Sequence, residues 1–138
     1  MTRLILALAI AAGASSIALA NEVEEPDLDA LKWVARPIVV FADAPQDPRL
    51  GHQLAEFEGD MAELEARDVE IIVDTAPGEK TPLRTRFHPR DFNVILIDKD
   101  GTVIYRKPDP VTVSEIIRLI DRTPIRRQEL EAQRNLNN

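Results

Sequence analysis

The amino-acid sequence predicts an α/β domain in which a four-stranded mixed sheet is flanked by helices. Three patterns support this prediction. Four short runs rich in β-branched residues have the composition of strands, one long apolar stripe has helical spacing, and the order of the segments combines a βαβ unit with a ββα unit. The predicted strands cover residues 38–41, 69–73, 94–97 and 102–106.

The centre of the predicted sheet is a hairpin at residues 92–107. Residues 94–97 form a continuous apolar run, which is typical of a strand buried on both faces. Residues 102–106 alternate in part, as a strand near a sheet edge does. The intervening residues favour a tight turn, because Asp98 can accept a bond from the backbone ahead of it and Gly101 can adopt a positive φ.

A βαβ unit precedes the hairpin, with a crossover that is expected to be right-handed. Its helix begins with Asp47 as the cap and Pro48 in the first turn. Apolar residues then recur three or four positions apart, which predicts one helix with a solvated acidic outer face. The stripe comprises Leu50, Leu54, Phe57, Met61 and Leu64.

Weaker signals place two further helices. Thr81 can cap a short helix in which Leu83 and Phe87 meet at i,i+4. After the hairpin, Thr112 and Glu115 have capping-box spacing ahead of a second long helix, which ends before the next proline. Its apolar face comprises Val113, Ile116, Ile117 and Ile120.

Two segments flank these elements. Trp33 lies in the approach to the first strand, and we expect it to pack on the core. Residues 125–134 are highly charged and favour a further short helix with little apolar backing. The complete order, β-α-β-(α)-β-β-α, is the thioredoxin-like arrangement.

The N-terminus has the three parts of a secretory signal peptide. Arg3 precedes an apolar stretch, and the stretch ends in Ala18-Leu19-Ala20, the small-x-small pattern of a cleavage site. The alternative is an uncleaved membrane anchor. However, Gly13 and two serines interrupt the apolar stretch, which is shorter than the ~20 residues needed to span a bilayer.

The predicted organisation therefore has four parts. They are a signal peptide at 1–20, an acidic leader at 21–30, a thioredoxin-like domain at 31–134 and a tail at 135–138. Cleavage after Ala20 would make the protein periplasmic or extracellular.

Composition narrows the possible functions. The chain has 138 residues and a net charge of −7; removing residues 1–20, which carry one arginine and no acid, leaves 118 residues with a net charge of −8. This length suits one domain, and the acidity argues against general binding to nucleic acid or anionic membranes. The chain contains no cysteine, which excludes thiol redox chemistry, disulfides and a cysteine-linked lipid anchor.

Several strings carry a family resemblance. They are the segments 36–41, 64–69, 92–101 and 120–129, the last with Asp121, Pro124, Arg126 and Glu129 in an Asp-x-x-Pro-x-Arg-x-x-Glu pattern. Over about residues 31–130, the chain resembles a secreted thioredoxin-like family of unknown function. That family occurs in bacterial exported proteins and is related to domains of animal extracellular-matrix proteins with sushi repeats. The resemblance implies a fold and an export route, and it implies no activity.

The sequence departs from the redox members of the thioredoxin class at two places. Those members carry a cysteine pair just after the first strand, where a helix N-terminus lowers the thiol pKa. They also carry a proline directly before the third strand. Here residues 42–47 contain no cysteine, and Asp91-Phe92-Asn93 stands where the proline would be. Both redox positions are therefore lost.

A first candidate site lies near this former redox corner. Asp43, Asp47 and His52 could bind a metal or move protons. However, Asp47 is needed as a helix cap, and His52 lies off the apolar stripe, as a surface histidine does. Metal sites also require three or four ligands, so the sequence favours structural or surface roles for these three residues over a metal or catalytic site.

A second candidate site is the basic run Arg84, Arg86, His88 and Arg90. It could hold a phosphate or carboxylate group of a small molecule or of a protein partner. The alternative is a set of solvated arginines that pair with the acidic first helix. A further basic group at 122–127 suits the C-terminal end of the last long helix, where cations interact favourably with the helix dipole.

We therefore expect an exported thioredoxin-like domain without thiol redox chemistry, acting as a binding or interaction module. The sequence has no metal-spaced cluster, Gly-rich phosphate loop or Ser/His/Asp constellation, so we expect neither a metal nor a cofactor. We also expect no nucleic-acid partner and no stable membrane anchor. The alternative is a peroxiredoxin-like or other thiol-free enzyme that uses the basic run from Arg84 to Arg90.

Overall fold

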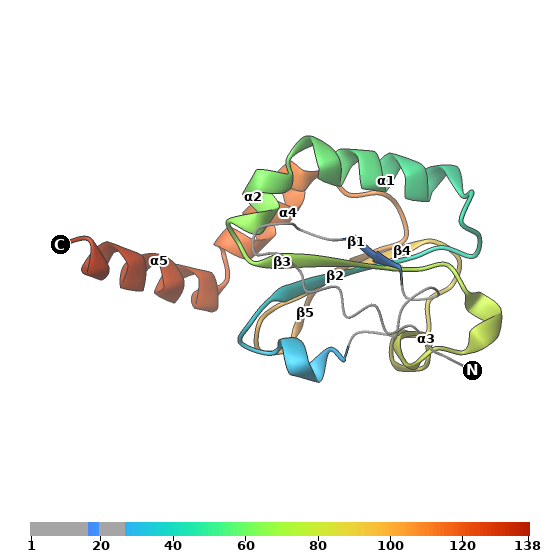
Figure 1. The fold of residues 1–138 in the computed structure, drawn as a ribbon, viewed down its shortest axis with the longest axis horizontal. Coiled ribbons are helices and arrows are strands. Elements are labelled where there is room, and N and C mark those ends of the chain that lie inside the picture. The colour runs from blue at the N-terminus through green and yellow to red at the C-terminus, as the bar shows by residue number, and fades with distance from the viewer. Residues whose placement is uncertain (1–16, 20–26) are drawn as a thin grey trace, which may run out of the picture.

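The computed structural model describes residues 17–19 and 27–138, in which helices cover both faces of a central sheet (Figure 1). The strands are β1 (Ile17–Leu19), β2 (Arg36–Phe41), β3 (Val69–Asp74), β4 (Asn93–Ile97) and β5 (Val103–Lys107). The helices are α1 (Pro48–Gly59), α2 (Met61–Glu65), α3 (Pro82–Phe87), α4 (Val113–Asp121) and α5 (Pro124–Leu136). Two 3-10 turns are η1 (Asp29–Leu31) and η2 (Pro77–Glu79).

The four predicted strands form the predicted mixed sheet, in the order β3-β2-β4-β5. β2 and β3 are parallel, whereas β4 is antiparallel to both β2 and β5. β1 adds a short strand parallel to β3 at the edge of the sheet. It falls within the segment predicted as a signal peptide, most of which, together with residues 20–26, lies outside the described residues.

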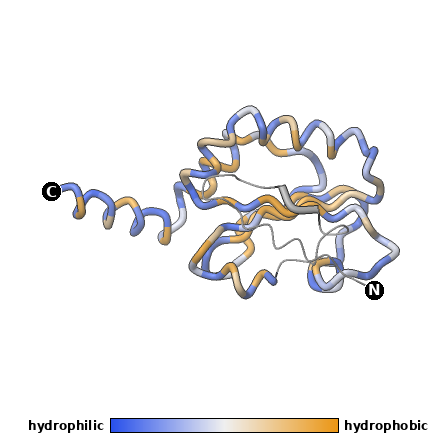
Figure 2. Tube along the Cα trace, viewed as in Figure 1, coloured by the Kyte–Doolittle hydropathy of each residue, from blue (hydrophilic) through white to orange (hydrophobic). Residues whose placement is uncertain are grey.

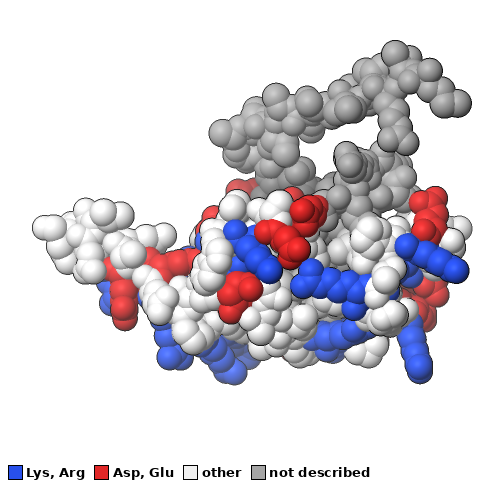
Figure 3. All heavy atoms as spheres, turned by 90° about the horizontal axis from the view of Figure 1, so that it is seen from below, with Lys and Arg blue, Asp and Glu red and all other residues white. Residues whose placement is uncertain are grey.

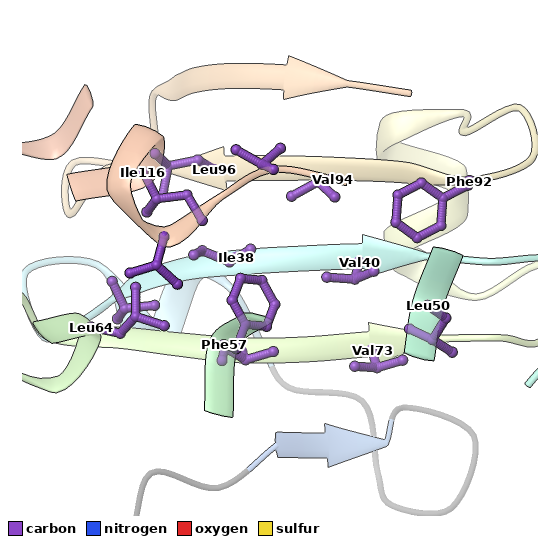
Figure 4. Packing of buried hydrophobic residues seen from close by; sticks show 14 of the residues in the cluster. Ile38, Val40, Leu50, Phe57, Leu64, Val73, Phe92, Val94, Leu96 and Ile116 are labelled. Carbon is purple, nitrogen blue, oxygen red and sulfur yellow. The ribbon is translucent and has the colours of Figure 1, made fainter. Parts of the chain in front are cut away.

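Alternation along each strand creates a hydrophobic cluster on each face of the sheet. Ile38 and Val40 point toward α1, α2 and α4, where Phe57, Leu64 and Ile116 pack against them (Figure 4). The other face carries the smaller cluster, to which α3 contributes two residues and η1 its flanking leucines. The strands are accordingly the most continuously hydrophobic part of the trace (Figure 2). The described residues of both clusters lie between positions 28 and 120.

The predicted first helix differs from the observed one in its continuity. The apolar stripe is correct, since Leu50, Phe57 and Leu64 are buried, but the helix is broken into α1 and α2 at Asp60, whose φ is −135°. The break follows Gly59, a poor helix former. Among the described residues, no helix has the length and hydropathy needed to cross a membrane.

Three local predictions of helix capping are confirmed. The side chains of Asp47, Thr81 and Thr112 each accept a backbone hydrogen bond at the start of α1, α3 and α4. The prediction for Trp33 is wrong, because its side chain is 67% exposed. Leu28 and Leu31 pack on the core instead, while the Trp33 backbone has a φ of 65° and donates to the carbonyl oxygen of Lys99 at 2.8 Å.

Gly101 has the predicted positive φ, 89°, in the β4–β5 turn. We expect Gly101→Val to lower the free energy of unfolding by about 1–2 kcal/mol, because a β-branched residue resists this conformation. Its Cβ would also lie 2.9 Å from Lys32 Cε. Urea denaturation measures the effect, with Gly51→Ala in open space on α1 as the control, which should be neutral or stabilising. An unchanged midpoint for Gly101→Val would contradict the prediction.

Candidate functional site

A hollow of about 570 Å³ lies at the end of the sheet where β2 and β3 finish and β4 begins. Three segments border it: Asp43 after β2, Lys80 after β3, and a third that comprises Arg84 and Thr85 of α3 and residues 88–91 of the loop before β4. We call this hollow the strand-end pocket. It adjoins both places at which the sequence departs from redox thioredoxins, after the first long strand and before β4.

Arg84 is a structural residue at the inner side of this pocket. Its side chain is 8% exposed and that of Asp74 only 1%, and the two form an ion pair with Nε 3.0 Å from Oδ1. The Arg84 guanidinium also donates to the carbonyl oxygens of Ala42 and Asp74 and lies over the ring of Phe41. Thr81 completes the arrangement by donating to Asp74 at 2.6 Å. Arg84 therefore joins the ends of β2 and β3 to α3, and most of its charge is compensated.

The loop that carries His88 and Arg90 is held from two sides. From the sheet, the Arg106 guanidinium of β5 donates to the carbonyl oxygen of Phe87 at 2.7 Å, and the Asn93 amide at the start of β4 donates to the carbonyl oxygen of Arg90 at 2.9 Å. From α1, Arg49 donates to the Asp91 carboxylate at 2.7 Å. The pocket-lining loop is therefore positioned before any ligand arrives.

Backbone strain concentrates around the strand-end pocket. Of the five non-glycine residues with positive φ in the described ranges, three border it: Lys80 at 46°, His88 at 45° and Asp91 at 56°. Such conformations persist only where the surroundings enforce them, and they cluster at functional sites. The strain therefore points to this end of the sheet as the functional one.

Three cationic or titratable side chains face this pocket without a counter-ion. Lys80, His88 and Arg90 are exposed, and within the described part of the chain none has an ion pair or side-chain hydrogen bond, whereas Asp43 and Asp91 face Arg84 and Arg49. Figure 3 shows basic side chains spread along this face of the molecule, with acidic side chains beside those at its right-hand end. The pocket therefore carries positive charge that no acidic side chain of the described residues neutralises, although the protein as a whole is acidic.

The four residues of the predicted basic run thus have three different positions. His88 and Arg90 line the pocket as exposed groups, and Arg84 is buried at its inner side. Arg86 points elsewhere, with its guanidinium over the ring of Phe87 and beside a small cleft near Asp98. None of the four pairs with the acidic face of α1, so the alternative interpretation of the run is wrong in that respect.

The other predicted group is dispersed. Asp43 borders the strand-end pocket, His52 is an exposed residue of α1, and Asp47 caps that helix. Hydrogen bonds from Arg49 hold the pKa of Asp47 below its ordinary value. Among residues 17–19 and 27–138, no cluster of three or more histidine or carboxylate side chains is arranged to hold a metal ion.

A second polar cluster lies at the opposite end of the sheet, where β2 begins. Arg36 is fully buried, and its guanidinium makes a bidentate pair with Glu129 of α5 at 3.1 and 3.2 Å and a third bond to Asp98. Lys99 and Arg126 also bind Glu129, at 2.8 and 3.2 Å. We call these five residues the Arg36 cluster.

The Arg36 cluster explains how α5 is attached. Of the α5 residues only Arg126 is buried, and the helix projects from the domain in Figure 1. α5 contributes little apolar surface to the core. Its first turns are therefore held by the ion pairs of Glu129 and by Thr123, the N-cap of the helix. Asp121 lies beside this cluster, because it pairs with Arg67 and its Oδ1 atom is 3.9 Å from the Arg126 Nε atom.

The ionisation of this cluster predicts acid sensitivity. Burial alone would raise the pKa of Glu129, but its bonds with Lys99, Arg36 and Arg126 prevail and lower the pKa from its ordinary 4.5. The hydrogen bond from Arg67 likewise lowers the pKa of Asp121 from 3.8. A carboxyl group with a lower pKa in the folded state stabilises the fold above its ordinary pKa, and this stability is lost as pH falls through the folded value.

We therefore expect the free energy of unfolding to fall as the pH drops below about 4.5, the ordinary pKa of Glu129. Glu129→Gln should be less stable than the native protein at neutral pH and should show a shallower loss of stability in acid. Urea midpoints measured from neutral pH to about pH 3 test this. A parallel decline in both proteins would show that Glu129 does not contribute to the pH dependence.

Sequence reasoning missed several residues of both sites. Asp74 follows a predicted strand directly, a position where its carboxylate could have been recognised as facing the sheet end. Lys80 lies in a predicted loop and has no distinguishing signal. The pairing of Arg36 with Glu129 spans 93 positions, a separation at which a single sequence gives no pairing information.

Comparison with known proteins places this geometry in context. A family model described as a domain of unknown function (DUF4174) matches residues 27–129. A comparison with curated proteins finds no match.

Solved structures with a similar fold include thioredoxins and peroxiredoxins. The reduced 2-Cys peroxiredoxin of Plasmodium vivax is 14% identical, with a TM-score of 0.59 over 75% of this chain and 85% of that chain. Thioredoxin peroxidase I of Plasmodium yoelii is 15% identical, with a TM-score of 0.56 over 68% and 75%. Thioredoxin-2 of a malaria parasite is 18% identical, with a TM-score of 0.52 over 80% and 98%. At these identities the similarity establishes the thioredoxin-like fold alone.

Proposed function

This chain belongs to the DUF4174 family of domains of unknown function, and we propose that it is an exported binding module that holds an anionic group in the strand-end pocket. The ligand is a small molecule with a phosphate-like or carboxylate group, or an acidic segment of a protein partner. The observation that carries this proposal is the placement of the exposed side chains of Lys80, His88 and Arg90 around one hollow, with a positive φ at Lys80 and His88.

Electrostatics supports binding at this position. The chain as a whole carries a net charge of −7 and repels anions at long range. Uncompensated cations in one concave site reverse this repulsion locally, and Arg90 offers the planar donor pattern that suits carboxylate and phosphate oxygens. Asp43, at the rim, supplies an acceptor for a hydroxyl or amine group of the same ligand.

Export is supported by the N-terminal sequence. The charged start, the apolar stretch and the Ala18-Leu19-Ala20 pattern are the parts of a cleavable signal peptide, and the resemblance to exported bacterial domains agrees with it. We propose cleavage after Ala20 and a periplasmic or extracellular mature protein.

A peroxiredoxin-like enzyme is the second candidate, because peroxiredoxins are among the structures with a similar fold. That chemistry uses a thiolate nucleophile, and this chain has no cysteine. Peroxide removal by the purified protein with a supplied thiol would favour this candidate over the binding module.

We expect the variant Lys80→Gln/His88→Gln/Arg90→Gln to lose binding of sulfate, a probe whose charge is constant near neutral pH. In the native protein, binding should weaken steeply with added salt, because salt screens the attraction between these cations and sulfate. Isothermal titration at low ionic strength measures the affinity.

Arg86→Gln is the matched control, since Arg86 belongs to the same basic run but points away from the pocket. It should bind sulfate as the native protein does. Retention of native affinity by the folded triple variant would refute the proposed site.

A further inference from the structure

The two edges of the sheet are built differently. At the β5 edge, the register shifts between Leu96 and Ile97, and Arg106 and Lys107 place charges in the edge strand. Both features discourage pairing with another strand. β3 pairs with β2 over six residues without a register shift, and it contains neither proline nor lysine. We call the backbone side of β3 that faces away from β2 the β3 edge.

The side chains of β3 offer the edge little protection. Ile71, Ile72 and Val73 are buried. Glu70 is half-buried, and it is one of the two acidic side chains of β3. Asp74 is occupied by the ion pair with Arg84. A largely apolar edge strand without proline, lysine or a register shift is a template for a further strand.

β1 shows what the β3 edge accepts. Ile17, Ala18 and Leu19 lie opposite Ile71, Ile72 and Val73 in parallel register, and β1 runs beside β3 in Figure 4. The cleavage proposed after Ala20 would remove this strand. The mature chain would then keep the described residues of both hydrophobic clusters, which begin at position 28, and present β3 as an open edge.

We propose that the β3 edge of the mature protein is a strand-acceptor site that binds an extended apolar peptide segment in parallel orientation. The leader residues Ile17–Leu19 occupy this site in the unprocessed chain. Main-chain hydrogen bonds supply the affinity, and alternate side chains of the bound segment pack toward the two faces of the sheet. The proposal rests on the cleavage proposed above and is independent of the strand-end pocket.

The test uses a chain that begins at Asn21 and a labelled synthetic peptide with the sequence of residues 15–20. Fluorescence anisotropy measures binding, and hydrogen exchange reports on the amides of β3. We expect saturable binding and roughly tenfold slower exchange of the β3 amides when the peptide is bound. The control peptide, methylated on the backbone nitrogens of residues 17–19, should not bind, because it lacks the donors of a strand.

The full-length chain with Ala20→Lys, which blocks the small-x-small pattern, is the second control. Its own leader should compete at high effective concentration and weaken peptide binding by at least about tenfold. Unchanged β3 exchange, equal binding of the methylated peptide, or β3 amides already protected by a second copy of the chain would overturn the proposal. Sulfate binding measured on the same chain shows separately whether the strand-end pocket functions.

Discussion

Arg36→Ala is expected to lower the free energy of unfolding by about 3–5 kcal/mol, because it removes one partner from a buried ionic cluster. Arg36 is fully buried. Its removal would leave Asp98 without an ion-pair partner, with only the hydrogen bond from the Lys99 backbone N–H to its carboxylate, and Glu129 would keep only Lys99 and Arg126. The loss should also release the first turns of α5, whose attachment depends on Glu129. Urea denaturation measures the stability, and far-ultraviolet circular dichroism measures the helix content.

Arg127→Ala provides the control for this prediction. Arg127 is an exposed residue on the same helix, and its substitution should change stability by no more than about 0.5 kcal/mol. Similar stabilities for Arg36→Ala and Arg127→Ala would mean that the Arg36 cluster does not hold the domain together.

Arg84→Gln is expected to be destabilising by a similar amount, about 3–5 kcal/mol. Asp74 has a side chain that is 1% exposed, and it would lose its ionic partner. The ends of β2 and β3 would also lose the donors that Arg84 provides to Ala42 and Asp74. Thermal and urea denaturation measure the effect.

The same substitution at Arg90 separates structure from binding. Arg90→Gln should leave stability within about 0.5 kcal/mol of the native value, because Arg90 is exposed. The double variant Arg84→Met/Asp74→Leu should recover part of the stability that Arg84→Gln loses, since no buried charge remains unpaired. If Arg84→Gln were as stable as Arg90→Gln, Arg84 would belong to the binding surface instead.

The fold could be predicted because its signals are local. Continuous β-branched runs specify β2, β3 and β4, and the capping residues Asp47, Thr81 and Thr112 mark three helix starts correctly. The break at Asp60 was not predicted, because the stripe of apolar residues continues across it. The prediction for Trp33 was wrong because tryptophan is highly buried on average in proteins. No local sequence signal indicates the positive φ that turns this residue outward.

The candidate site could be predicted only in outline. The basic run drew attention to the segment that borders the strand-end pocket, but a run of charges does not show which members are buried. Arg84 differs from Arg90 because α3 brings it against Asp74, ten positions earlier in the chain. Arg86 differs because the helix turns it toward another face. These differences arise from tertiary contacts. They distinguish an arginine that stabilises the fold from the exposed side chains that can contact a ligand.

The most direct test of the binding module is a titration of the isotope-labelled mature protein with sulfate, followed by amide chemical shifts. The proposed function predicts saturable shifts confined to the segments around Asp43, Lys80 and residues 88–91, with little change near Arg36 or along β5. The shifts should disappear in Lys80→Gln/His88→Gln/Arg90→Gln, whose spectrum should remain that of a folded protein. Shifts that are absent, or that are spread evenly over exposed basic residues such as Arg122 and Arg127, would contradict the proposal that the strand-end pocket binds anions.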